Sequence, residues 1–90
     1  MGLNDTLKAI SDPVRRNILN MLKDEKKSAG QIAEQFSLSD ATVSHHLKQL
    51  KNADLVIVTK YKNFIYYELN STVFEEVLLW IYSLGGAKNE

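Results

Sequence analysis

The sequence predicts a small, mostly α-helical domain that carries one β-hairpin. Apolar residues recur at helical spacing in several short segments, and β-branched and aromatic residues alternate on both sides of a polar tip near residues 60–63. The 90 residues include no cysteine and fit a single domain, 1–90, without disulfides. Because no apolar run approaches about 18 residues and the first residues lack a signal-peptide pattern, we expect a cytoplasmic protein.

Two amphipathic helices are expected at the start of the chain. The first spans about residues 4–11, and the second begins at Pro13, where no backbone N–H is needed, with Asp12 as N-cap. Their apolar stripes are Leu3, Leu7 and Ile10 in the first helix and Val14, Ile18, Met21 and Leu22 in the second. Arg15 and Arg16 are interpreted as surface or ion-paired residues, with contacts to a phosphate as the alternative. Residues 24–27 are expected to form a charged turn.

Residues 28–52 predict two short helices joined by a tight turn at residues 37–38. Ser28 and Gln31 have capping-box spacing, and Ser39 suits the N-cap of the second helix. The stripes expected to face the core are Ala29, Ile32, Ala33 and Phe36 in the first helix and Val43, Leu47 and Leu50 in the second. Two helices, a tight turn and a polar outer face form a helix-turn-helix pattern.

The outer face of this second helix is the candidate DNA-reading surface. Opposite its apolar stripe lie Ala41, Thr42, His45, Lys48, Gln49 and Asn52, with Ser44 at the border. Small and hydroxyl side chains enter a major groove without clashes, and the longer polar ones can donate to bases and phosphates. The chain has no net charge, but residues 42–63 carry four lysines against one aspartate, a local +3. A merely solvated helix face is the alternative.

The segment at residues 55–69 predicts a β-hairpin with the tip Lys60-Tyr61-Lys62-Asn63. Two lysines at the tip, directly after a reading helix, indicate a wing that touches DNA. An ordinary solvated hairpin is the alternative, since lysines on exposed strands also prevent aggregation.

The last helix is expected to start at residues 70–72, with Thr72 and Glu75 in capping-box spacing, and to end at Gly85-Gly86. It is apolar on more sides than one small domain can cover, so we expect it to form a homodimer interface with the first helix. The predicted interface residues are Leu3, Leu7, Ile10, Val73, Val77, Leu78, Trp80, Ile81 and Leu84. Residues 88–90 are expected to be a frayed tail.

Three segments of the chain resemble the ArsR/SmtB family of winged-helix repressors. They are LKAISDPVRRNILNML (7–22), QIAEQFSLSDATVSHHLKQLKNADLV (31–56) and FIYYELN (64–70). The resemblance implies a winged helix-turn-helix fold and a homodimer that represses by binding an imperfect palindrome in double-stranded DNA at a promoter, similar to the metal-free autorepressors of the family. The predicted DNA contacts are Ser39, Asp40, Ala41, Thr42, Ser44, His45, Lys48, Gln49, Lys51, Lys60 and Lys62.

The sequence departs from the family pattern at two turns. Asp54 stands where the family usually has glycine before the first wing strand, and Lys62-Asn63 stands where the wing tip usually carries Gly-Arg. Aspartate enters turn conformations readily, so the first change is tolerable. The second leaves lysine as the charge of the wing and puts a minor-groove arginine contact in doubt.

Residues suited to metal binding or catalysis are sparse. Metal sensors of the family place cysteines near residues 29–33 or mixed ligands on the last helix, where this chain offers Glu75 and Glu76 without a histidine. His45 and His46 are adjacent on one helix and therefore point apart; His46 is expected to be partly buried. We expect no metal, no cofactor, no small-molecule substrate and no enzymatic activity, since no acid orients a Ser44–His45 pair.

Without a visible ligand site, a protein antagonist, dilution or regulated expression would have to release the DNA. The alternative function is a winged-helix module for protein interaction that does not bind DNA.

Overall fold

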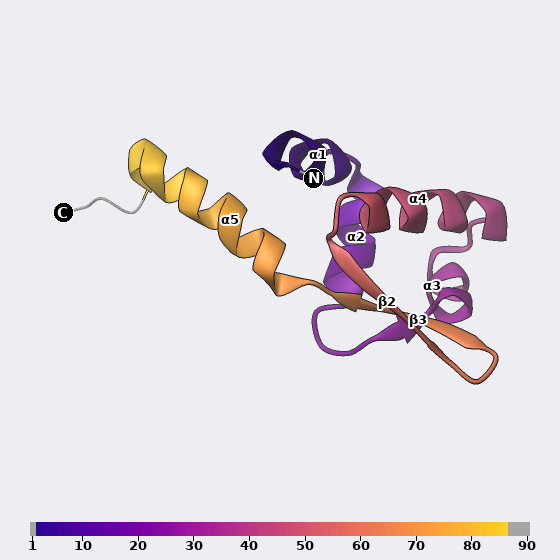
Figure 1. Ribbon diagram of the computed structural model, residues 1–90. Coiled ribbons are helices and arrows are strands. Elements are labelled where there is room, and N and C mark those ends of the chain that lie inside the picture. Colours follow the sequence, from indigo (N-terminus) through magenta and orange to yellow (C-terminus); the bar gives the residue numbers. More distant parts are fainter. Residues whose placement is uncertain (1, 87–90) are drawn as a thin grey trace.

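The computed structural model describes residues 2–86 and, within them, five α-helices and a three-stranded antiparallel sheet (Figure 1). The elements are α1 (Leu3–Ala9), α2 (Pro13–Met21), β1 (Lys27–Ser28), α3 (Ala29–Phe36), α4 (Asp40–Asn52), β2 (Val56–Tyr61), β3 (Phe64–Leu69) and α5 (Ser71–Ile81), which a π-helical turn at Tyr82–Gly86 extends. The predicted class, mostly α with a hairpin in a winged helix-turn-helix arrangement, is confirmed. No helix within residues 2–86 has both the length and the hydrophobicity needed to cross a lipid bilayer.

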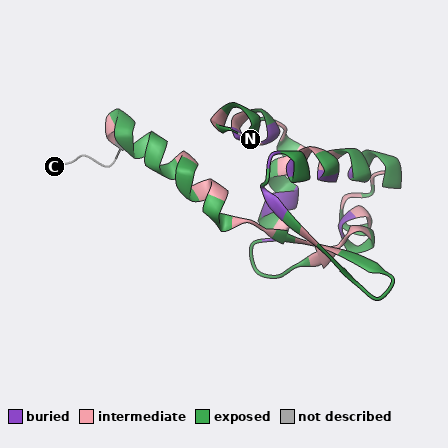
Figure 2. Cartoon of the chain, viewed as in Figure 1, coloured by how far each residue is buried: buried purple, intermediate pink, exposed green. Residues whose placement is uncertain are grey.

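The hydrophobic core lies where α2, α3 and α4 meet the start of β2. Each helix contributes its predicted stripe, and the largest fully buried side chains are Ile18, Ile32, Val43, Leu47, Leu50 and Leu55. Figure 2 shows this burial on the inner sides of α2 and α4, whereas α5 is exposed over most of its length. The extents of 50 × 23 × 23 Å are elongated because α5 runs away from the other elements (Figure 1).

The predicted helix starts of α2 and α3 are confirmed. Asp12 Oδ1 accepts hydrogen bonds from the backbone N–H groups of Val14 (2.8 Å) and Arg15 (3.1 Å). The Arg15 N–H is the main reason that the pKa of the Asp12 carboxyl lies below its ordinary value, and the Val14 N–H and the Arg15 charge act in the same direction.

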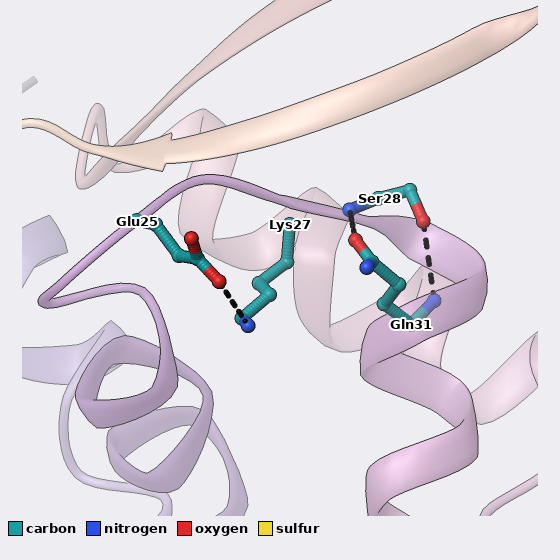
Figure 3. A network of polar contacts seen from close by, with 4 residues as sticks. All are labelled: Glu25, Lys27, Ser28 and Gln31. Carbon is teal, nitrogen blue, oxygen red and sulfur yellow. Dashed lines mark hydrogen bonds and ion pairs between the residues drawn. The ribbon is translucent and has the colours of Figure 1, made fainter.

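Ser28 and Gln31 form a complete capping box (Figure 3). The Ser28 N–H donates to Gln31 Oε1 at 2.8 Å, and the Gln31 N–H donates to Ser28 Oγ at 3.2 Å. Two free donors at the start of α3 are thereby satisfied. In the same view, Lys27 Nζ lies 2.8 Å from Glu25 Oε2 and lowers the pKa of that carboxyl, chiefly through the hydrogen bond.

The predicted charged turn at residues 24–27 is wrong at its last residue. Lys27 and Ser28 form β1 and pair with Tyr67 and Tyr66 of β3, so the strand order is β1-β3-β2. The hairpin thus has a third strand that ties the helix-turn-helix to the wing. A strand of two residues has no periodicity by which the sequence could reveal it.

The predicted alternation is confirmed in β2 but is wrong in β3, where Tyr66 and Tyr67 are both half-buried and Ile65 is exposed. β2 and β3 pair from Val56↔Leu69 to Tyr61↔Phe64, which leaves residues 62–63 as a two-residue turn. The predicted tip at residues 60–63 is therefore too long, because Lys60 and Tyr61 belong to β2. Val56 is buried and Val58 half-buried, whereas Ile57 and Thr59 between and beyond them are exposed.

The predicted Thr72–Glu75 capping box is wrong, because α5 begins at Ser71 with Asn70 at the N-cap. Asn70 instead contacts the turn between α4 and β2: its Nδ2 donates to the Asp54 carbonyl at 2.9 Å, and its N–H donates to the Leu55 carbonyl at 2.9 Å. The predicted end of the helix is confirmed by Gly85, whose φ of 96° is left-handed. Residues 88–90, predicted to be a frayed tail, lie outside the described residues.

Candidate nucleic-acid interface

The N-terminal part of α4 is held by Ser39, as predicted. Ser39 Oγ accepts from the Thr42 N–H at 3.1 Å and donates to Thr42 Oγ1 at 2.8 Å. Because Val43, Leu47 and Leu50 are 2% exposed or less, the opposite side of the helix faces outward. The predicted contact residues that lie exposed on this helix or at its cap are Ser39, Asp40, Ala41, Thr42, Ser44, His45, Lys48 and Lys51.

Gln49 lies differently from the other predicted contacts of α4. Its side chain is half-buried and lines a shallow hollow of about 210 Å³ between α4 and α1, together with Asp5, Lys8 and Asn52. Helical spacing alone could not show this, because it does not tell where α1 packs. The exposed part of the candidate DNA-reading surface is therefore centred on the first three turns of α4.

The hairpin presents the two predicted lysines of the wing. Lys60 and Lys62 are exposed, and Lys62 Nζ lies 5.4 Å from the centre of the Tyr61 ring. The aromatic side chains of Tyr61 and Phe64, paired across the end of the hairpin, are 60% and 56% exposed. Figure 1 shows the hairpin tip and the N-terminal end of α4 at the same end of the molecule, away from α5.

Arg15 and Arg16 have partners that the sequence did not reveal. Arg15 Nε donates to the Ala9 carbonyl at 2.6 Å, and Arg16 Nη1 donates to the Ile10 carbonyl at 2.8 Å. Both side chains therefore bind free carbonyls at the end of α1. These hydrogen bonds agree with the expected structural role of the two arginines rather than with a phosphate contact. Their partners are backbone carbonyls, however, and not the carboxylates of ion pairs.

The two histidines of α4 have separate environments. His45 is exposed, whereas His46 is half-buried, as predicted, and its Nδ1 lies 3.3 Å from Arg15 Nη1. The ring planes are tilted by 60°, with centroids 5.8 Å apart. Within residues 2–86, no three histidine, aspartate or glutamate side chains are grouped as a metal ion would need.

Comparison with known proteins decides the family. The profile described as "Bacterial regulatory protein, arsR family" matches residues 12–58, which include α2, both helices of the helix-turn-helix and the first half of β2. The chain belongs to the ArsR family. The ArsR-family assignment is supported by the transcriptional repressor SdpR of Bacillus subtilis, which is 46% identical over 88% of each chain.

Two further proteins show how far the similarity extends. The arsenical resistance operon repressor of Staphylococcus aureus is 34% identical to this ArsR-family chain over 84% of the chain and 73% of the repressor. A crystal structure of the ArsR-family regulator RHA00566 has a TM-score of 0.87, covers 92% of this chain and 91% of its own, and is 20% identical. That structure supports the fold, and the repressors support DNA-binding repression as the function. Because the family consists of regulators, the prediction that the chain is not an enzyme is confirmed.

The predicted dimer interface of this ArsR-family chain includes large exposed apolar side chains in and directly after the second half of α5. Leu78, Trp80, Ile81 and Leu84 are between 42% and 69% exposed, and Leu79 beside them is 66% exposed. The other predicted interface residues, Leu3, Leu7, Ile10, Val73 and Val77, are half-buried within one chain. Since α1 and α5 contact each other, these residues belong to one part of the molecule.

Proposed function

We propose that this ArsR-family chain represses transcription in the cytoplasm by binding a palindromic promoter operator as a homodimer, and that it regulates its own gene without a metal signal. The observation that carries the proposal is the division of α4 into a fully buried apolar stripe and an exposed face of small, hydroxyl and basic side chains. A helix of this kind can enter the major groove of DNA with its interior side still packed on the protein.

The proposed contacts divide into base and backbone contacts. Ala41, Thr42, Ser44 and His45 lie on the exposed early turns of α4 and would meet base edges, with Ser39 and Asp40 at the helix start. The lysines at 48 and 51 on α4 and at 60 and 62 on the wing would meet phosphates. Gln49 keeps at most an edge position in this contact map, because it is half-buried against α1.

The exposed apolar surface of α5 supports the homodimer. A monomer rarely leaves so many large apolar side chains of one helix in water, and a second copy would cover them. Two copies related by a two-fold axis would place two α4 helices in successive major grooves, with half-sites about 34–36 Å apart. Binding there would block RNA polymerase.

Release of the operator is proposed to come from a protein antagonist, from dilution or from regulated expression rather than from a bound metal. The absence of cysteine from the sequence removes the thiolate sites that metal sensors of the family use.

The contact map can be tested by fluorescence anisotropy with the DNA upstream of the chain's own gene, titrated at several salt concentrations. The affinity falls as salt is added, and each phosphate contact contributes about 0.9 to the steepness of log K against log salt concentration. A dimer carries two copies of each lysine, so Lys48→Ala or Lys62→Ala should reduce this steepness by about 1.8. Lys23→Ala, an exposed lysine just after α2, is the matched control. Unchanged affinity and slope in both test variants would refute the assignment.

The protein-interaction module is the second candidate, favoured by the zero net charge and by the exposed α5. The same titration separates the two functions. Failure of the unsubstituted protein to bind any duplex at low salt would support the module.

A further inference from the structure

One side chain, Arg15, joins the helix proposed for pairing to the helix proposed for reading DNA. From its place in the first turn of α2 it reaches the end of α1, where Nε donates to the Ala9 carbonyl at 2.6 Å and Nη2 to the Lys8 carbonyl at 3.4 Å. On the other side, Nη1 lies 3.3 Å from His46 Nδ1 on α4. The guanidinium therefore bridges α1 and α4 across α2.

The chemistry of the two groups fixes the direction of the contact with α4. A guanidinium has five N–H donors and no acceptor, so in a hydrogen bond between these two groups Arg15 donates and His46 Nδ1 accepts. His46 is half-buried, and its neighbour His45 is on the exposed reading face. A planar group with fixed donor directions restricts both partners more than a flexible ammonium could.

The helix α1 needs such contacts to keep its direction. It has seven residues, fewer than a helix needs to persist on its own, and only residues 10–12 connect it to α2. Leu3 and Leu7 of α1, and Ile10 directly after it, belong to the proposed pairing surface. In a two-fold dimer, the angle between the pairing helix and the reading helix sets how far apart the two reading helices stand.

We propose that the Arg15–His46 contact is a positioning contact that sets which half-site spacing the dimer accepts. Arg15 touches no base in this proposal; it acts through the orientation of α4 relative to α1. The inference rests on the proposed function, because it assumes a dimer on a palindrome.

The neighbouring Arg16 offers a matched control. It lies on the same turn of α2 and also binds the end of α1, through the Ile10 carbonyl at 2.8 Å, and its side chain is exposed. Substituting either arginine by alanine removes a hydrogen bond to a carbonyl at the end of α1, but only the Arg15 substitution removes the contact with His46. If Arg15 acted only by binding the carbonyls at the end of α1, Arg15→Ala and Arg16→Ala would have the same effect on the spacing preference.

The experiment measures the affinity of the full chain for a set of palindromic duplexes that differ only in the spacer between half-sites, from two base pairs shorter to two longer than the best. The unsubstituted protein should favour one spacing, because each added base pair moves and rotates the second half-site. In Arg15→Ala and His46→Leu, the preference for that spacing over its neighbours should fall about threefold to tenfold, the range expected for one hydrogen bond of ordinary net strength.

Two further variants sharpen the reading. Arg16→Ala should keep the spacing preference, and His46→Asn, which offers an amide oxygen near the position of Nδ1, should restore part of it. Circular dichroism and thermal unfolding show whether each variant is folded. A variant that does not fold is replaced by Arg15→Lys, which keeps the positive charge but lacks the planar guanidinium and its fixed N–H directions.

The outcomes are separable. A spacing preference that is unchanged in Arg15→Ala and His46→Leu, or that falls equally in Arg16→Ala, would overturn the positioning role while leaving the repressor intact. If the unsubstituted protein bound none of the palindromic duplexes, the proposed function would fail and the positioning role with it.

Discussion

The helices α4 and α5 are both rich in apolar residues, but the chain covers only one of them. In α4, the stripe of Val43, Leu47 and Leu50 is 2% exposed or less. In α5, no residue between Ser71 and Ile81 is buried, and Leu79 is 66% exposed. The apolar side of α4 is thus covered by its own domain, which leaves its polar side free for a ligand. Within residues 2–86, nothing covers the large apolar side chains in the second half of α5 in the same way.

The largest effect on stability is expected from a substitution in the buried apolar stripe of α4. Leu47→Ala should lower the free energy of unfolding by about 2–5 kcal/mol, because it removes buried atoms and leaves a cavity. Ile65→Ala, at a position that is 45% exposed on the wing, should cost less than about 1 kcal/mol. Urea unfolding followed by circular dichroism gives both values, and similar losses would contradict the buried position assigned to Leu47.

The next largest effect is expected on dimer formation, from a charge placed on the exposed apolar side of α5. Leu78→Glu places a charge on the proposed pairing surface of α5, where the side chain is 46% exposed in one subunit. The dimer dissociation constant should rise at least about tenfold, equivalent to about 1.4 kcal/mol, because the charge would lose water on pairing. Sedimentation equilibrium measures the constant. Thr72→Glu, an exposed position at the start of the same helix, is the control, and an equal shift in both would contradict the assigned interface.

A smaller effect is expected at the joint between the two regions. Asp54 follows α4 with a φ of 59°, a left-handed conformation that favours glycine, and its carbonyl accepts from Asn70 at the start of α5. Asp54→Gly should raise the free energy of unfolding by up to about 1 kcal/mol, because the strain at this turn is removed. Asn63→Gly, at a turn residue whose φ is not left-handed, should give no gain. Thermal unfolding of the two variants decides the point.

The smallest effect is expected on the acid dependence of stability, through Asp12 at the start of α2. The N–H groups of Arg15 and Val14 and the charge of Arg15 lower the pKa of Asp12 in the folded chain. The resulting stabilisation is fully present above the pKa of the unfolded chain and is lost as the pH falls through the lower pKa of the folded chain. Asp12→Asn keeps a good N-cap without the titration, so its stability should fall less steeply below about pH 4. Parallel acid-unfolding curves would contradict this assignment.

The parts of the fold that could be predicted were those with a local cause. Helical stripes, the Asp12 and Ser39 caps, the Ser28–Gln31 box and the alternation along the first half of β2 all follow from residues close together in the sequence. Because these signals agree with one another along residues 12–70, the winged helix-turn-helix fold could be predicted from them.

The parts that could not be predicted depend on distant neighbours. The half-buried position of Gln49 depends on where α1 packs, and the short strand at residues 27–28 exists only because β3 lies beside it. Arg15 reaches His46 across 31 positions of sequence, and no spacing rule connects them. The two unusual turn residues, Asp54 and Lys62, were recognisable as departures from glycine, and both have left-handed backbones.

The uncovered side of α5 has a consequence for dosage. If two subunits must meet before either holds DNA firmly, then at low abundance promoter occupancy grows with the square of the subunit concentration rather than in proportion to it. A gene controlled in this way is transcribed while few copies of the protein are present and becomes repressed over a narrow range of protein concentration. The exposed leucines of α5 would thus make the promoter respond to a threshold amount of protein.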